Sequence, residues 1–156
     1  MRITHSIMEN KKGFGFWVLI IVSIVLVVFL IIGQTLSLID YDLALSLGLQ
    51  ESEKEIGKVG IAFAKGFAFG DTIFYVPLLV FGILGLLKGK KWGTVLMLGA
   101  LGISIYWPIV HLYAIYIDTE AITLDPEKYI SFPIVLSLIT IYGLWGIYYL
   151  YKNSRD

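Results

Sequence analysis

The amino-acid sequence predicts an all-α integral membrane protein whose four transmembrane helices form one up-down-up-down bundle. Of its 156 residues, 58% are hydrophobic and 15% are charged, and the mean hydropathy is +0.82. This composition is too apolar for a soluble domain of the same size. Four apolar runs meet or approach the roughly 20 helical residues that cross a bilayer core of about 30 Å. Each run has Trp or Tyr near an end, as helices that reach the membrane interface often do.

The first run, residues 14–39, follows Lys11 and Lys12. A short apolar stretch with a small-residue cleavage site, the mark of a signal peptide, is not seen there, so we expect a membrane anchor. The other runs cover residues 67–87, 92–117 and 130–150. Because the four runs account for most of the chain, we expect one domain over residues 1–156.

The segment between the first two runs, residues 40–66, is too long for a simple turn. Ser52 and Glu55 have the spacing of a capping box, which begins a helix. Apolar residues then recur at helical spacing: Ile56, Val59 and Phe63. The pattern predicts an amphipathic helix over about 53–65 that lies in the membrane interface or covers the bundle. Its glycines weaken a helix, so we expect a broken or mobile element.

The distribution of charge predicts the orientation in the membrane. The two termini and the turn at residues 88–91 hold eight of the twelve Lys and Arg residues. The other two connections hold ten of the twelve acidic residues, if Asp40 and Asp71 are counted with them. Because cationic loops stay on the cytoplasmic side, both termini are expected in the cytoplasm. The Ile and Lys content, with no Cys, favours a prokaryotic cell membrane.

The sequence excludes some classes of chemistry and gives no motif for several others. The chain has no Cys, which removes thiol redox chemistry, thiolate metal sites and cysteine nucleophiles. HExxH, GxSxG, P-loop and GxGxxG patterns are also missing from the sequence. An enzyme is therefore not favoured, and we expect no nucleic-acid partner.

Polar residues inside the apolar runs are the first candidates for function, because an ionisable side chain at the centre of a membrane helix costs about 2.5 to 3.5 kcal/mol. Asp71 is interpreted either as a helix N-cap or as a functional carboxylate. Tyr75, four residues later, shares its face. His111 could bind a metal, act as a base, or simply hydrogen-bond to another helix. Pro108 is expected to kink the helix just before His111.

Seven candidate ligand-binding residues come from three of the helices and all fall in the outer half of the membrane. They are Gln34, Asp40, Asp71, Tyr75, Trp107, His111 and Asp118. We expect them to form an outward-facing polar, acidic and aromatic cup. In the inner half, small-residue pairs predict close helix packing: Gly82 and Gly85, Gly99 and Gly102, and Gly143 and Gly146.

Three functions are compatible with this pattern. The preferred hypothesis is a protein that binds or transports a small cationic, amphiphilic or lipid-like ligand in the cup. The first alternative is a membrane enzyme for a lipid-like substrate, in which His111 holds a divalent metal, or forms a base–acid pair, with a carboxylate: Asp40, Asp71 or Asp118. The second is a structural or accessory subunit that docks a membrane partner or another copy of itself. The sequence identifies no cofactor.

Overall fold

The computed structural model describes residues 12–117, 120 and 122–153, and these residues form helices and connections without a β-strand. The elements in chain order are α1 (Phe14–Leu30), η1 (Ile31–Thr35), α2 (Leu36–Ile39), α3 (Tyr41–Ser46), α4 (Glu53–Gly70), η2 (Asp71–Tyr75), α5 (Val76–Leu87), α6 (Lys91–Ile117) and α7 (Lys128–Asn153). The segments η1 and η2 are single stretches of π-helix.

Within the described residues, four helical stretches are long and apolar enough to cross a membrane. They are Phe14–Ile39, Glu53–Leu87, Lys91–Ile117 and Lys128–Asn153. The predicted class, an all-helical bundle with four candidate membrane spans, is therefore confirmed.

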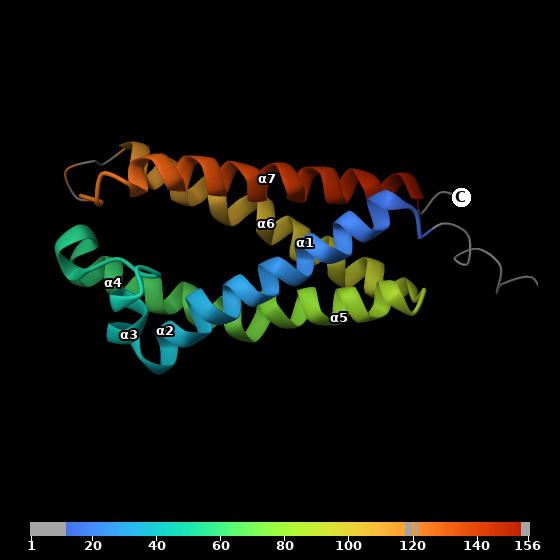
Figure 1. The fold of residues 1–156 in the computed structure, drawn as a ribbon, viewed down its shortest axis with the longest axis horizontal. Helices are drawn as coiled ribbons and strands as arrows, with labels where there is room; N and C mark the ends of the chain where they lie inside the picture. Colours follow the sequence, from blue (N-terminus) through green and yellow to red (C-terminus); the bar gives the residue numbers. More distant parts are fainter. Residues whose placement is uncertain (1–11, 118–119, 121, 154–156) are drawn as a thin grey trace, which may run out of the picture.

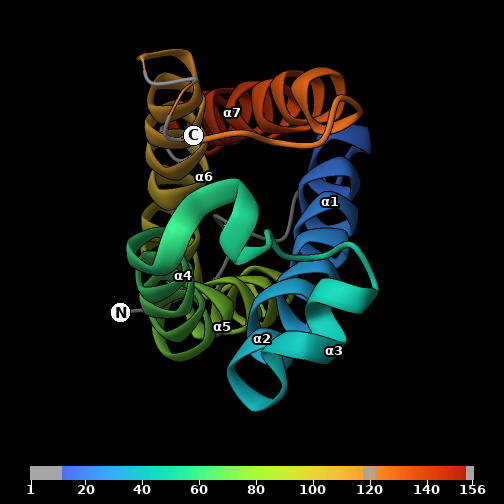
Figure 2. The ribbon, with the colours of Figure 1, turned by 90° about the vertical axis from the view of Figure 1, so that its left-hand side faces the viewer.

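The helices run back and forth along the long axis of the molecule (Figure 1). The start of α1, the end of α7 and the turn between α5 and α6 lie at one end, which we call the terminal end. The opposite end, which we call the loop end, carries α3, the start of α4 and residues 122–127. Helix α6 packs against both α5 and α7, and α1 packs against α5. Figure 2, which looks at the loop end, shows α6 and α7 adjoining and α1 on the side away from α6.

The second membrane span differs from the prediction. Residues 53–65 and 67–87 were expected to be separate elements, but α4, η2 and α5 join into one continuous helical stretch, Glu53–Leu87. Its 35 residues extend about 52 Å at 1.5 Å per residue, which exceeds a bilayer core. Gly66 and Gly70 do not interrupt it, because a glycine lowers helix stability without forbidding the helical backbone.

The break in this stretch lies at Gly57. Its backbone has φ 65° and ψ 173°, a conformation that is almost restricted to glycine. The first turn of α4 is thus set at an angle to the rest of the helix. The predicted capping box is confirmed at its start, where the Ser52 amide donates a hydrogen bond of 2.7 Å to Glu55 Oε2.

Helices α5 and α6 approach most closely at the terminal end, through glycine. A Cβ atom on Gly85 would lie 2.3 Å from the Cα atom of Gly93, and one on Gly82 would lie 3.1 Å from the Met97 backbone. Such an approach is possible only because glycine has no side chain, and it is typical of helix packing in membranes.

Helices α6 and α7 are also packed through glycine, in part as predicted. A Cβ atom on Gly143 would lie 3.0 Å from the Leu101 carbonyl oxygen, and one on Gly146 would meet the Leu101 side chain at 2.9 Å. The predicted contact through Gly99 and Gly102 is wrong for this chain. Gly102 would meet nothing within 4 Å, and Gly99 would meet only the Leu78 side chain at 3.7 Å.

A hydrogen-bonded group that the sequence did not indicate joins three helices in the core. The Tyr142 hydroxyl donates to the Leu19 carbonyl oxygen at 2.9 Å. It also lies 2.7 Å from the Ser23 hydroxyl. The same Ser23 hydroxyl lies 3.6 Å from the Met97 sulfur atom. Helices α1, α6 and α7 are thus fixed together near the terminal end.

We predict that Gly85→Ala destabilises the protein by about 1 to 3 kcal/mol, because the new methyl group overlaps the α6 backbone. Gly102→Ala is the matched control, because its methyl group would meet nothing within 4 Å among the residues that the structure describes. It should be neutral or stabilising by up to about 1 kcal/mol, as alanine favours a helix. Thermal unfolding of both variants in the same detergent measures the difference, and equal stabilities would contradict the described packing.

Candidate functional site

Two π-helical segments meet in the loop-end half of the bundle. The Thr35 hydroxyl of η1 lies 3.0 Å from the Thr72 hydroxyl of η2. A π turn interrupts the regular α-helical ladder of hydrogen bonds, and such turns are frequent at functional sites. In η1, the Gly33 carbonyl oxygen accepts a hydrogen bond of 3.0 Å from the buried Gln50 side chain. The connection before α4 is thereby held against the first span.

Asp71 is the first residue of η2 and is 6% exposed. Its backbone is helical, with φ −64° and ψ −43°, and the helix continues on both sides. The N-cap interpretation is therefore wrong. Within the described part of the chain, its Oδ2 atom is buried without a hydrogen-bond partner. A buried polar atom in this state needs an explanation, because the free energy lost on leaving water is not recovered.

Two contacts define how the α4–η2 stretch faces α6. The Tyr75 hydroxyl and the Ser104 hydroxyl are 2.5 Å apart. Ser104 donates to the Ala100 carbonyl oxygen at 3.1 Å, so Tyr75 must be the donor to Ser104. Eight residues before Tyr75, the Phe67 ring contacts the His111 ring with centroids 5.7 Å apart. The two stretches therefore run antiparallel in a fixed register.

This register places Asp71 and Trp107 at the same level. Asp71 lies four residues from both Phe67 and Tyr75, and Trp107 lies between Ser104 and His111. Among the described residues, the buried side-chain atoms without a partner are Asp71 Oδ2 and Trp107 Nε1. One is a carboxylate oxygen and the other is an N–H donor, so their chemistry is complementary. Because they are unpaired, neither satisfies the other directly.

A narrow apolar crevice with a volume of about 10 Å³, which is room for about one water molecule, adjoins this level. Tyr75, Ser104 and Trp107 are among its lining residues, but they expose only apolar atoms to it. The other lining residues are apolar and come from α1, α6 and α7: Leu26, Phe29, Leu30, Ile103 and Ile139. Phe29 is 47% exposed, so the crevice reaches the surface of the bundle that lipid would cover.

His111 lies in an aromatic environment. Its ring stacks on Trp107 with centroids 5.0 Å apart and an interplanar angle of 22°. Within residues 12–117, 120 and 122–153, no three His, Asp or Glu side chains group together as metal ligands. The metal site proposed for His111 and Asp71 therefore has no ligand set in that part of the chain.

The remaining predicted site residues do not join Asp71 and Trp107 through any described contact. Asp40 is exposed and caps α3, where its Oδ1 atom accepts a 2.9 Å hydrogen bond from the Leu43 amide. Gln34 is half-buried in η1. Asp118 lies outside the described residues. The structure thus brings together Asp71, Tyr75, Trp107 and His111, and Asp71 and Tyr75 are buried instead of lining an open cup.

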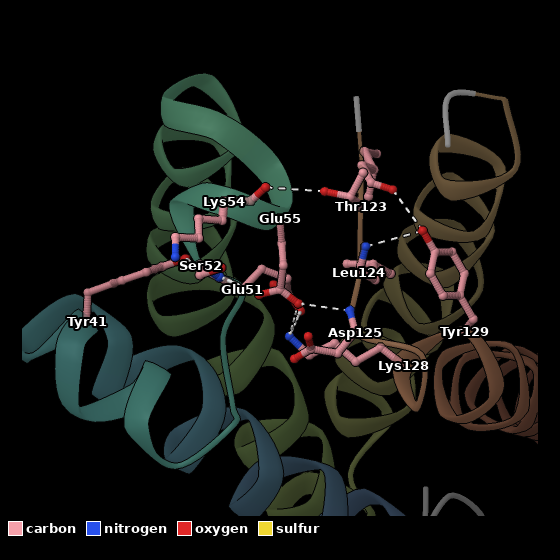
Figure 3. Close-up of polar contacts among 11 residues, drawn as sticks. Tyr41, Glu51, Ser52, Lys54, Glu55, Thr123, Leu124, Asp125, Lys128 and Tyr129 are labelled. Carbon is pink, nitrogen blue, oxygen red and sulfur yellow. Dashed lines mark hydrogen bonds and ion pairs between the residues drawn. The ribbon is translucent and has the colours of Figure 1, made fainter. Parts of the chain in front are cut away.

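A second polar cluster, which we call the loop-end bridge, comprises Glu51, Glu55, Thr123, Asp125 and Lys128 (Figure 3). Lys128 Nζ lies 2.8 Å from Glu55 Oε1 and 3.9 Å from Glu51 Oε1. The Asp125 amide donates to Glu55 Oε1 at 3.3 Å, and the Thr123 amide donates to the Glu55 carbonyl oxygen at 2.9 Å. The bridge ties the start of α4 to the start of α7.

Sequence reasoning missed this bridge. It identified Glu55 only as part of a capping box and Lys128 only as a loop charge, because a pairing across 73 residues leaves no local pattern. Burial raises the pKa of Glu51, and the nearby Lys128 ammonium group partly offsets that rise. The Glu51 carbonyl oxygen also accepts a 2.9 Å hydrogen bond from Tyr41.

No family model, curated protein or solved structure matches this chain.

We predict that Lys128→Met destabilises the protein by about 1 to 3 kcal/mol, because it leaves the Glu55 carboxylate buried without its cationic partner. Lys58→Met is the control, since Lys58 is exposed on α4 and should change stability by less than about 0.5 kcal/mol. Thermal unfolding in detergent tests the pair of variants. If both lose the same stability, the bridge does not hold the loop end together.

Proposed function

We propose that the protein binds a lipid-like amphiphile in the loop-end half of the membrane. The carrying observation is the pair of buried, unpaired polar atoms, Asp71 Oδ2 and Trp107 Nε1, which belong to the facing segments η2 and α6. Leaving each atom unsatisfied costs about 1 to 3 kcal/mol. A ligand that offers hydrogen-bonding groups at this level removes that cost.

The walls of the crevice favour an amphiphile over a bare ion. Ligand sites are mostly apolar concavities with a few polar groups that fix orientation. Here a hydrocarbon chain would lie against the lipid-facing surface beside Phe29, while Asp71 and Trp107 would hold its polar head. Phe29, which is partly exposed at the crevice, offers a route of entry from the bilayer. Such binding is also the first step that transport of the same ligand would require.

The distribution of Lys and Arg supports an orientation in which the loop end faces away from the cytoplasm. Lys88, Lys90 and Lys91 lie in or beside the turn at the terminal end, together with Lys12 and Lys152 near the two termini. The loop end carries the acidic bridge. Under the positive-inside rule, the terminal end is cytoplasmic, and the ligand enters from the outer leaflet.

A second candidate function, that of an accessory subunit, is favoured by unused glycine surface. Gly66 and Gly70 lie one turn apart on α4, and a Cβ atom on either would meet nothing within 4 Å. Gly102 on α6 is open in the same way. Small residues at this spacing let a helix from another chain approach closely. This surface is separate from the crevice, so the two candidate functions are compatible.

Native mass spectrometry of protein released gently from membranes tests the proposal. We expect wild-type protein to retain a lipid-like mass, and Asp71→Leu to lose most of it, because the leucine removes the unpaired acceptor oxygen of Asp71. Asp42→Leu is the matched control at an exposed position and should retain the ligand. An empty wild-type protein, or equal retention in both variants, would contradict the proposal.

A further inference from the structure

Asp71 belongs to the part of the second span that a bilayer core would enclose. Lys88 begins the cationic turn at the terminal end and marks where this span leaves the membrane. Asp71 precedes Leu87, the last residue of the span, by 16 positions (71 to 87), which is about 24 Å of helix. A hydrocarbon core is about 30 Å thick, so Asp71 lies within it.

The Asp71 carboxyl group has no described partner that would favour a negative charge. Its side chain is 6% exposed, and its Oδ2 atom is buried without a hydrogen-bond partner among the described residues. In the part of the chain that the structure describes, ion pairs are formed by Lys128 at the loop end, and Asp71 takes part in none. An ionised carboxylate here would lose its hydration and gain no counter-charge.

Its own helical stretch offers no cation to Asp71. The nearest lysine in sequence is Lys65, whose ammonium group lies over the Tyr41 ring, 5.1 Å from the centroid. The following helix, α5, contains no ionisable side chain. Tyr75, one turn after Asp71, has its hydroxyl group against Ser104 and carries no positive charge in any state.

The segments that face η2 also lack a cation paired with Asp71. From the first span, η1 contacts η2 through Thr35 and contains no ionisable side chain. From α6, His111 can ionise near neutral pH. Its ring lies between aromatic neighbours, stacked on Trp107 and in contact with Phe67, and it forms no described ion pair with Asp71.

A carboxyl group in such surroundings avoids the cost of a buried charge by binding a proton, because the neutral acid is far easier to remove from water than the carboxylate. We propose that Asp71 holds a proton at neutral pH and is thus a proton-binding site inside the membrane. This inference goes beyond the proposed function, since the proton is held with or without an amphiphile. The neutral acid keeps one acceptor oxygen and gains one donor, so it is compatible with that function.

Infrared spectroscopy of the purified full-length protein at neutral pH tests the proposal, because a carboxylic acid has a carbonyl stretching band that a carboxylate lacks. Comparison of unlabelled protein with protein that contains isotope-labelled aspartate separates this band from the ester bands of lipids. We expect an aspartic-acid band in the wild-type protein and its loss in Asp71→Asn. Asp42→Asn is the matched control at an exposed position of α3 and should keep the band.

Thermal unfolding at several pH values gives an independent check. Unfolding exposes Asp71 to water, where an aspartate ionises above about pH 4. If only the folded protein holds the proton, the unfolded protein binds fewer protons, so the stability contributed by Asp71 falls as the pH rises from about 4 to 7. Asparagine does not ionise. We therefore expect the melting temperature of Asp71→Asn, relative to wild type, to rise by at least about 3 °C over this range, and that of Asp42→Asn to change less.

The outcomes separate this inference from the proposed function. Absence of an aspartic-acid band in the wild-type protein, a band that persists in Asp71→Asn, or a melting-temperature difference that does not change with pH would overturn the proton site. A band that belongs to Asp71, found in protein that retains no lipid-like mass, would support the proton site and contradict the proposed ligand.

Discussion

The core of a bilayer contains no water to satisfy a polar atom, so each buried donor or acceptor in this bundle must find a partner within the protein or on a ligand. Several polar side chains in the described spans meet this requirement, either across helices or on the backbone of their own helix. Ser23 and Tyr142 pair near the terminal end, and Thr35 pairs with Thr72 in the loop-end half. Asp71 Oδ2 and Trp107 Nε1 are the exceptions among the described residues, because they are buried without a hydrogen-bond partner. The proposed function is based on these two atoms.

The bundle is built differently at its two ends. At the terminal end, glycine contacts bring α5, α6 and α7 together at distances that admit no side chain. Toward the loop end, the described contacts between helices include the Thr35–Thr72 hydroxyl pair and the Phe67–His111 ring contact. The loop-end bridge adds to these contacts, because Lys128 and Glu55 join α7 to α4. The terminal half is thus closely packed through glycine, and the proposed ligand would bind in the loop-end half.

The sequence predicted those features that depend on local composition. The four spans follow from hydropathy, the start of α4 follows from the spacing of Ser52 and Glu55, and the packing of Gly82, Gly85, Gly143 and Gly146 follows from small-residue spacing. The sequence also selected Asp71, Tyr75, Trp107 and His111 as candidates, and the structure places them on facing stretches of helix. Asp71 was interpreted as a possible helix N-cap because Asp is among the residues favoured at that position, but the helix continues through it.

Features that depend on distant residues were not predictable in this way. The π turns have no reliable local pattern, and the pairing of Lys128 with Glu55 requires knowledge of which helix ends adjoin. The same reason explains the error at Gly99 and Gly102, since glycine spacing shows that a face is smooth but not which helix covers it. The lack of a hydrogen-bond partner for Trp107 Nε1 also could not be predicted, because it depends on the positions of all neighbouring acceptor atoms.

The most direct test of the account is a structure of the protein purified from its own membrane, at a resolution that shows single ordered oxygen atoms. The account predicts density for a non-protein polar group within about 3 Å of Asp71 Oδ2 or Trp107 Nε1, continuous with a chain at the lipid-facing surface beside Phe29. A direct hydrogen bond from Trp107 to a protein acceptor, with no such density, would contradict it.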